Sequence, residues 1–120
     1  MANVDFMRAA VIGCGSLGRT HTKMLAEIYE AAMVAFCDIN ESAASGLCET
    51  AGGEYATTDV ARVLEDDSID AVYVCTLHDS HASLCIAAAE AGKHILVEKP
   101  LALSVEECLE VGRAVERTGV

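Results

Sequence analysis

The chain has 120 residues, 52% of them hydrophobic, and a formal net charge of −11 at pH 7. This length suits a single domain with enough apolar side chains for a core. The acidic excess argues against nucleic acid or an anionic membrane as partner, because both attract basic surfaces. We expect neither a signal peptide nor a bilayer-spanning segment, and therefore a cytoplasmic protein.

Six cysteines are many for so short a chain. None forms a C-x-x-C pair, and several fall inside apolar runs. Structural zinc sites usually show closely paired ligands, so we expect no metal site. The cysteines are predicted to be reduced and to serve as small apolar side chains. They are Cys14, Cys37, Cys48, Cys75, Cys85 and Cys108.

Four apolar runs and one shorter segment are predicted to be strands. The runs show almost no alternation, which is typical of parallel strands covered on both faces. Residues 1–5 are expected to form a loose tail ahead of the first strand. The predicted strands are Phe6–Ile12, Met33–Cys37, Glu54–Ala56, Ala71–Cys75 and Ile95–Val97.

Helical periodicity and capping residues fill the segments between these strands. From Ser16 to about Glu30, one face carries four apolar residues that we expect to turn toward the sheet: Leu17, Met24, Leu25 and Ile28. The predicted N-caps of the later helices are Asn40, then Thr58 or Asp59, then Asp79 or Ser80, and finally Ser104. Glycines at Gly52, Gly53 and Gly92 are expected to end two of the helices.

The last helix opens with Ser104-x-x-Glu107, the pattern of a capping box. We expect its inward face to consist of Val105, Cys108, Leu109, Gly112 and Val115. Because right-handed crossovers join alternating strands and helices, the whole pattern predicts an α/β, Rossmann-type doubly wound parallel sheet of about five strands, in the order 3-2-1-4-5. The chain stops at Val120, where a sixth strand is expected, so residues 1–120 are predicted to be one domain of a longer protein.

A glycine pattern, Gly13-x-Gly15-x-x-Gly18, joins the first predicted strand to the first helix. Gly13 permits a tight turn, Gly15 allows a pyrophosphate to approach the backbone, and Gly18 allows close packing of the helix on the sheet. The N–H groups at the start of that helix would face the phosphates. This arrangement is typical of a nicotinamide dinucleotide site, and we expect that cofactor to contact Gly13, Gly15, Ser16, Leu17 and Gly18.

Asp38 ends the second predicted strand, twenty residues after Gly18. At this place a carboxylate can accept hydrogen bonds from the adenosine ribose, although a simple strand-end aspartate is the alternative. A 2′-phosphate would need a nearby arginine or lysine, yet residues 24–61 contain neither, and Glu41 adds negative charge. NAD is therefore the predicted cofactor in preference to NADP.

Polar residues also follow the fourth and fifth strands. Thr76 can contact the cofactor. A nucleophilic role for Cys75 is a less favoured alternative, because burial raises the pKa of a thiol. Metal binding by His78 and His81 is also less favoured. After the fifth strand, Lys99 in Glu98-Lys99-Pro100 can bind a substrate hydroxyl or carbonyl and assist proton transfer. A solvated surface lysine is the alternative.

These motifs resemble the N-terminal half of the Gfo/Idh/MocA family, which includes glucose–fructose oxidoreductase and inositol dehydrogenases. The resemblance rests on the segments 13–21, 70–76 and 91–102, with His81. It implies an NAD(P)-binding Rossmann domain, cofactor contacts at Thr76, Glu98 and Lys99, and a catalytic role beside the cofactor for Lys99. Leu77 departs from the family, in which proline is common at this place.

The resemblance further implies a small-molecule substrate, a sugar or polyol, for a full-length parent. The family's second α/β domain supplies substrate and oligomer contacts and a further acid or base, so a homo-oligomer is possible. We expect the isolated chain to bind cofactor without turnover. A non-catalytic NAD(H) sensor and an interaction domain with a vestigial nucleotide loop are the alternatives.

Overall fold

The computed structural model describes residues 6–120, whose strands form one sheet with the order β3-β2-β1-β4-β5. This is the predicted Rossmann-type fold and strand order; the predicted tail at residues 1–5 lies outside the described residues. The strands are β1 (Met7–Ile12), β2 (Ala31–Cys37), β3 (Tyr55–Thr57), β4 (Ala71–Val74) and β5 (His94–Val97). The helices are α1 (Ser16–Ala26), α2 (Glu41–Ala51), α3 (Val60–Leu64), α4 (His81–Glu90) and α5 (Val105–Thr118), with a 3-10 turn η1 (His78–Ser80) before α4.

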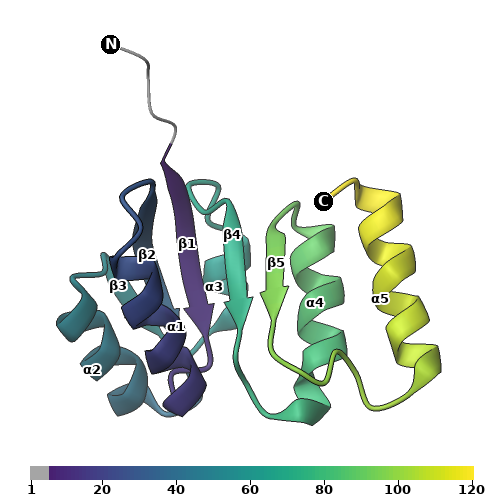
Figure 1. Ribbon diagram of the computed structural model, residues 1–120, viewed down its shortest axis with the longest axis horizontal. Helices are drawn as coiled ribbons and strands as arrows, with labels where there is room; N and C mark the ends of the chain where they lie inside the picture. The colour runs from purple at the N-terminus through teal and green to yellow at the C-terminus, as the bar shows by residue number, and fades with distance from the viewer. Residues whose placement is uncertain (1–5) are drawn as a thin grey trace.

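All the strand pairs in the sheet are parallel, so every strand ends at the same edge (Figure 1). β1 is central: the last residue of that strand, Ile12, pairs with Cys37 of β2 and with Val74 of β4. The order reverses at β1, because the chain first moves outward to β3 and then returns to β4. Loops after β1, β2 and β4 therefore meet at this switch point, where ligands bind in such folds.

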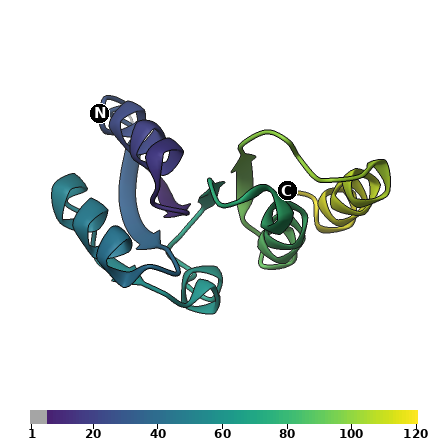
Figure 2. The same ribbon diagram turned by 90° about the horizontal axis from the view of Figure 1, so that it is seen from below.

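Helices cover both faces of the sheet, with α1 on one side and α3 and α4 on the other (Figure 2). One hydrophobic core contains Val72 of β4, Val63 of α3 and Ala88 of α4. A second core contains Val11 of β1 and Leu47 of α2. Among the described residues, no helix has both the length and the apolar composition needed to cross a bilayer.

Side-chain caps define three of the helix starts, much as the sequence predicts. Asn40 accepts a hydrogen bond from the Ala43 N–H at 3.2 Å, and Asp59, rather than Thr58, accepts from Ala61 at 3.0 Å. In the predicted capping box, Ser104 Oγ accepts from the Glu107 N–H at 3.1 Å. The Glu107 carboxylate reaches back one residue further than expected, to the Leu103 N–H. Gly52 and Gly92 adopt the positive φ expected where helices end.

The predicted start of α4 is correct in position, but the cap residue makes no side-chain hydrogen bond to the helix. Ser80 occupies the cap position, but neither its side chain nor that of Asp79 caps the helix. Instead Ser80 Oγ donates to the Leu77 carbonyl at 2.7 Å and lies 2.5 Å from Thr76 Oγ1. The Ser80 hydroxyl is therefore directed into the turn before the helix.

The predicted inward face of α1 is also wrong. The helix ends at Ala26, not near Glu30, and its buried residues are Gly18, Thr22 and Leu25. Of the predicted face only Leu25 is buried, whereas the three other apolar residues are about half exposed: Leu17, Met24 and Ile28. Small residues face the sheet because the helix lies very close to it at Gly18.

The inward face of α5 differs from the prediction for another reason. This helix packs beside α4 at the outer edge of the molecule and not flat on the sheet (Figure 1). A helix–helix contact is narrower than a helix–sheet contact, and Val111 and Ala114 fill it. Cys108 and Val115 are partly buried. The remaining predicted residues are exposed: Val105, Leu109 and Gly112.

Candidate functional site

A cleft of about 680 Å³ lies at the carboxyl edge of the sheet, where β1, β2 and β4 end. The loops after these strands bring together residues that are far apart in the sequence. Most of the predicted cofactor contacts line this cleft. They are Gly13, Gly15, Ser16, Leu17, Asp38 and Thr76.

The glycine loop is shaped by contacts that leave no room for side chains at two of its positions. Gly13 has φ +99°, and a Cβ there would lie 2.5 Å from the Cys75 carbonyl carbon and 2.7 Å from the Thr76 nitrogen. A Cβ on Gly18 would collide with the Gly13 carbonyl oxygen and lie 3.3 Å from Val11 Cγ1. Both glycines are therefore required by the packing of the loop itself.

Gly15 has a different role, because nothing lies within 4 Å of the position its Cβ would occupy. Its φ of −81° is also accessible to any residue, so neither strain nor crowding requires glycine here. The open space faces the cleft that Gly15 lines. A bare backbone beside open space fits the close approach of a pyrophosphate.

The start of α1 provides free hydrogen-bond donors next to this space. Gly15 is the N-cap, no side chain caps the helix, and its first turn carries no acidic residue. The first N–H groups of a helix have no partner within the helix. Together with the positive end of the helix dipole, these donors can hold an anionic group.

Asp38 is anchored by two backbone groups and retains acceptor capacity. Its Oδ2 accepts from the Cys14 N–H at 2.7 Å, and its Oδ1 accepts from the Asn40 N–H at 2.8 Å. An ionised carboxylate offers about four lone-pair sites, so about two remain for other donors. Asp38 also lines the cleft, which makes it able to bind ribose hydroxyl groups.

Apolar side chains stand on two of the loops that line the cleft. Ile39, after β2, is 94% exposed, and Leu77, after β4, is 78% exposed. Both line the cleft together with Val60 at the start of α3. Such side chains can cover the faces of an aromatic base. Position 77, where proline is common in the family that the sequence resembles, carries leucine here.

Glu98 and Lys99 do not line the cleft; they follow β5, the neighbour of β4. Glu98 Oε1 lies 2.6 Å from His21 Nε2, and its Oε2 accepts from the Lys99 N–H at 3.3 Å. The hydrogen bond from His21 lowers the pKa of Glu98 below its ordinary 4.5. The His21 ring in turn meets the Tyr73 ring edge-on, with 5.5 Å between centroids. Lys99 itself is exposed.

The geometry disfavours both alternative chemistries of the loop after β4. Burial, with a smaller contribution from the Glu98 charge, raises the pKa of Cys75 to about 11, so this thiol is protonated at neutral pH. Burial and the Asp38 charge raise the pKa of Cys14 to about 12. Both ring nitrogens of His81 face backbone carbonyl oxygens, which occupies the atoms that a metal would need.

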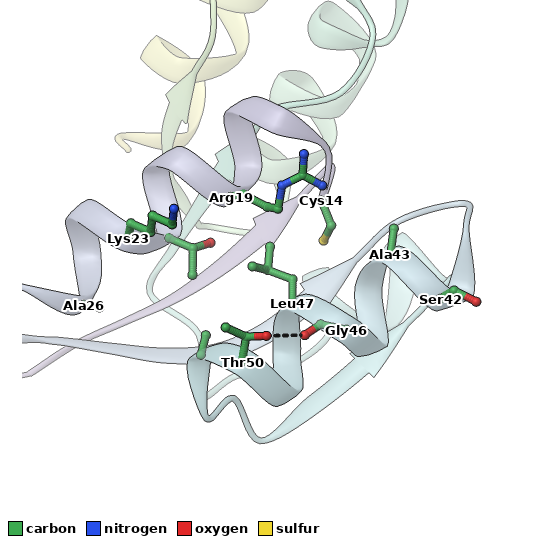
Figure 3. Close-up of a pocket in the computed structure, with 11 residues that line it drawn as sticks. Cys14, Arg19, Lys23, Ala26, Ser42, Ala43, Gly46, Leu47 and Thr50 are labelled. Carbon is green, nitrogen blue, oxygen red and sulfur yellow. Dashed lines mark hydrogen bonds between the residues drawn. The ribbon is translucent and has the colours of Figure 1, made fainter.

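A smaller groove of about 360 Å³ lies between α1 and α2 (Figure 3). Arg19 and Lys23 of α1 and Ser42 of α2 line it, with Leu47 and Cys14 further in. Arg19 and Lys23 do not line the larger cleft that contains Asp38.

Sequence reasoning missed two features of the site. His21 was given no role, although it holds Glu98 across 77 residues of chain. Only the tertiary arrangement brings α1 to the end of β5. The apolar residues Ile39 and Val60, which line the cleft, were also not predicted as site residues. Ile39 could have been predicted, because it directly follows Asp38, the predicted ribose-binding residue.

The fold and the cleft define a dinucleotide-binding domain of the Rossmann type. Residues 7–120 match the family described as "Oxidoreductase family, NAD-binding Rossmann fold". The chain belongs to this family, the Gfo/Idh/MocA oxidoreductases.

The relatives of the chain include inositol dehydrogenases. Myo-inositol 2-dehydrogenase of Thermotoga maritima is 38% identical over 112 residues, covering 93% of this chain and 33% of that protein. The scyllo-inositol 2-dehydrogenase (NAD(+)) of Bacillus subtilis is 40% identical over 115 residues, covering 95% of this chain and 34% of that protein. The chain thus spans about a third of the length of these relatives.

Solved structures show the same fold. A probable dehydrogenase from Thermotoga maritima has a TM-score of 0.91 at 34% identity, covering 95% of this chain and 34% of that one. A 3-ketoreductase from Actinomadura kijaniata, in complex with NADP and TDP-benzene, has a TM-score of 0.90 at 28% identity, covering 96% of this chain and 35% of that one.

Proposed function

We propose that the chain is the cofactor-binding domain of an oxidoreductase that transfers hydride between NAD and a cyclitol, sugar or related secondary alcohol. The observation that carries this proposal is the single cleft that combines the open space at Gly15, the uncapped start of α1 and the acceptor sites of Asp38. The names of the two inositol dehydrogenases support the alcohol class of substrate.

We favour NAD over NADP because the Asp38 carboxylate would repel a 2′-phosphate. No lysine or arginine occurs in residues 24–61 to offset that repulsion. Arg19 and Lys23 lie before this window, and they line the groove between α1 and α2 instead of the cleft. The Bacillus subtilis relative is named for NAD(+), whereas the Actinomadura kijaniata relative was solved with NADP, so both cofactors occur among relatives.

Lys99 is the residue to which we assign substrate contact. It is exposed at the carboxyl end of β5, and its backbone is held by the Glu98 side chain, which His21 fixes in turn. A bound nicotinamide supplies the hydride acceptor or donor. Lys99 would donate a hydrogen bond to the substrate oxygen and help to move the proton that accompanies hydride transfer.

A calorimetric titration of the 120-residue chain with NAD⁺ and NADP⁺ tests the proposal. We expect binding of both, with NAD⁺ bound at least tenfold more tightly, and no turnover of myo-inositol by the isolated chain. Absence of any NAD⁺ binding would favour an interaction domain with a vestigial loop. Tighter binding of NADP⁺ would contradict the repulsion argument for Asp38.

In a protein of the relatives' full length, the substitution Lys99→Ala would distinguish an enzyme from a non-catalytic NAD(H) sensor. We expect turnover to be lost while NAD⁺ affinity stays within about twofold, because Lys99 does not line the cleft. A control variant, Lys23→Ala, removes an exposed cation from the groove between α1 and α2 and should keep turnover. Full turnover in Lys99→Ala would favour the sensor.

A further inference from the structure

His81 is a fully buried polar residue at the first position of α4. Its Nδ1 lies 2.7 Å from the Pro100 carbonyl oxygen, and its Nε2 lies 2.9 Å from the Thr76 carbonyl oxygen. These carbonyls belong to two different loops, one after β4 and one after β5. A single imidazole ring therefore bridges the loop that carries Thr76 and the loop that carries Lys99.

The chemistry of these contacts is unusual because both partners can only accept. A neutral imidazole has one N–H, so one ring nitrogen would point its lone pair at a carbonyl oxygen. The ring with two protons donates from both nitrogens and satisfies both carbonyls. Inside a protein, a buried polar atom without a partner is costly, so the number of protons on His81 matters for how firmly the loops are held.

We infer that His81 is a positioning residue that joins the Thr76 loop to the Lys99 loop through its two ring nitrogens. This inference rests on the proposed function, which gives Thr76 a cofactor contact and Lys99 a substrate contact. His81 touches neither ligand. It acts by fixing the distance between the two contacts through the Thr76 and Pro100 carbonyls.

Amide chemical shifts test the two-loop contact. The N–H groups of Leu77 and Leu101 share their peptide units with the Thr76 and Pro100 carbonyls. In ¹H–¹⁵N spectra recorded at one pH, the variant His81→Gln should shift both amides, whereas the control His94→Gln, at the exposed start of β5, should leave both unchanged. The inference is overturned if only one amide, or neither, shifts in His81→Gln.

NAD⁺ affinity tests the functional consequence. We expect His81→Gln to bind NAD⁺ about fivefold more weakly than the parent chain, because the Thr76 loop loses one hydrogen bond to the ring. The control His94→Gln, at the exposed start of β5, should keep the parental affinity. Parental affinity in a folded His81→Gln would refute the inference.

The two measurements also separate this inference from the proposed function. If the chain binds no NAD⁺, the proposed function is contradicted, while the amide shifts of Leu77 and Leu101 still decide whether His81 holds both loops. If His81→Gln does not fold, the same two measurements on His81→Asn decide.

Discussion

Replacing Gly15 or Gly18 by alanine should separate binding from stability within one loop. At Gly18 the new Cβ would collide with the Gly13 carbonyl and meet Val11 Cγ1 at 3.3 Å. The obstacle is backbone in a turn with φ +99°, so α1 must move away from the sheet. Overpacking costs about 1–3 kcal/mol, and the better helix propensity of alanine offsets about 1 kcal/mol. Because the collision is with rigid backbone, we expect a net loss of about 2 kcal/mol.

At Gly15 the new Cβ meets nothing within 4 Å, so the free energy of unfolding should change by less than about 1 kcal/mol. The methyl group would instead occupy the space proposed for the pyrophosphate. Loss of one or two hydrogen bonds to a charged group, at about 1.5–3 kcal/mol each, corresponds to at least a tenfold weaker affinity for NAD⁺.

Urea unfolding followed by circular dichroism, paired with calorimetric titration of NAD⁺, measures both effects in each variant. We expect Gly18→Ala to lower the urea midpoint strongly and Gly15→Ala to lower affinity alone. Parental stability in Gly18→Ala would refute the packing argument. Parental affinity in a folded Gly15→Ala would show that the phosphates do not approach at this point.

Three further outcomes are expected. Asp38→Asn should weaken NADH binding about tenfold and reduce the preference for NADH over NADPH, because the carboxylate no longer repels the 2′-phosphate. An unchanged ratio of the NADPH and NADH dissociation constants in fluorescence titrations would contradict this. Cys75 should react slowly with iodoacetamide at pH 7.5 and faster as the pH approaches its pKa of about 11, and rapid labelling in the native chain, identified by mass spectrometry, would show a thiolate. Asn40→Ala should cost about 1 kcal/mol of unfolding free energy through loss of the bond to Ala43, with Ser42→Ala as the exposed control.

Local rules predicted the fold well where a short pattern fixes the structure. The apolar runs and the caps at Asn40 and Ser104 depend on neighbours within a few residues, and the strand order follows from the handedness of crossovers. The faces of α1 and α5 were predicted less well. Apolar periodicity assumes that large side chains face the sheet, whereas α1 approaches the sheet at Gly18 and α5 packs mainly against α4.

The candidate site divides in the same way. The glycine loop and Asp38 were recognisable because their spacing reflects a turn and a strand length. The contact between His21 and Glu98, and the two carbonyls around His81, join residues from separate elements. No periodicity or local motif contains such contacts, so their chemistry emerged only from the arrangement of the elements in space.

The two backbone hydrogen bonds to Asp38 have a consequence for the thermodynamics of ligand binding. They hold the carboxylate in one rotamer and tie the glycine loop to the end of β2 in the free chain. The conformational entropy of this side chain and loop is therefore lost when the chain folds, before any cofactor arrives. Binding then avoids most of that ordering cost, which is the advantage of a preorganised site. Folding stability and cofactor affinity draw on the same two hydrogen bonds.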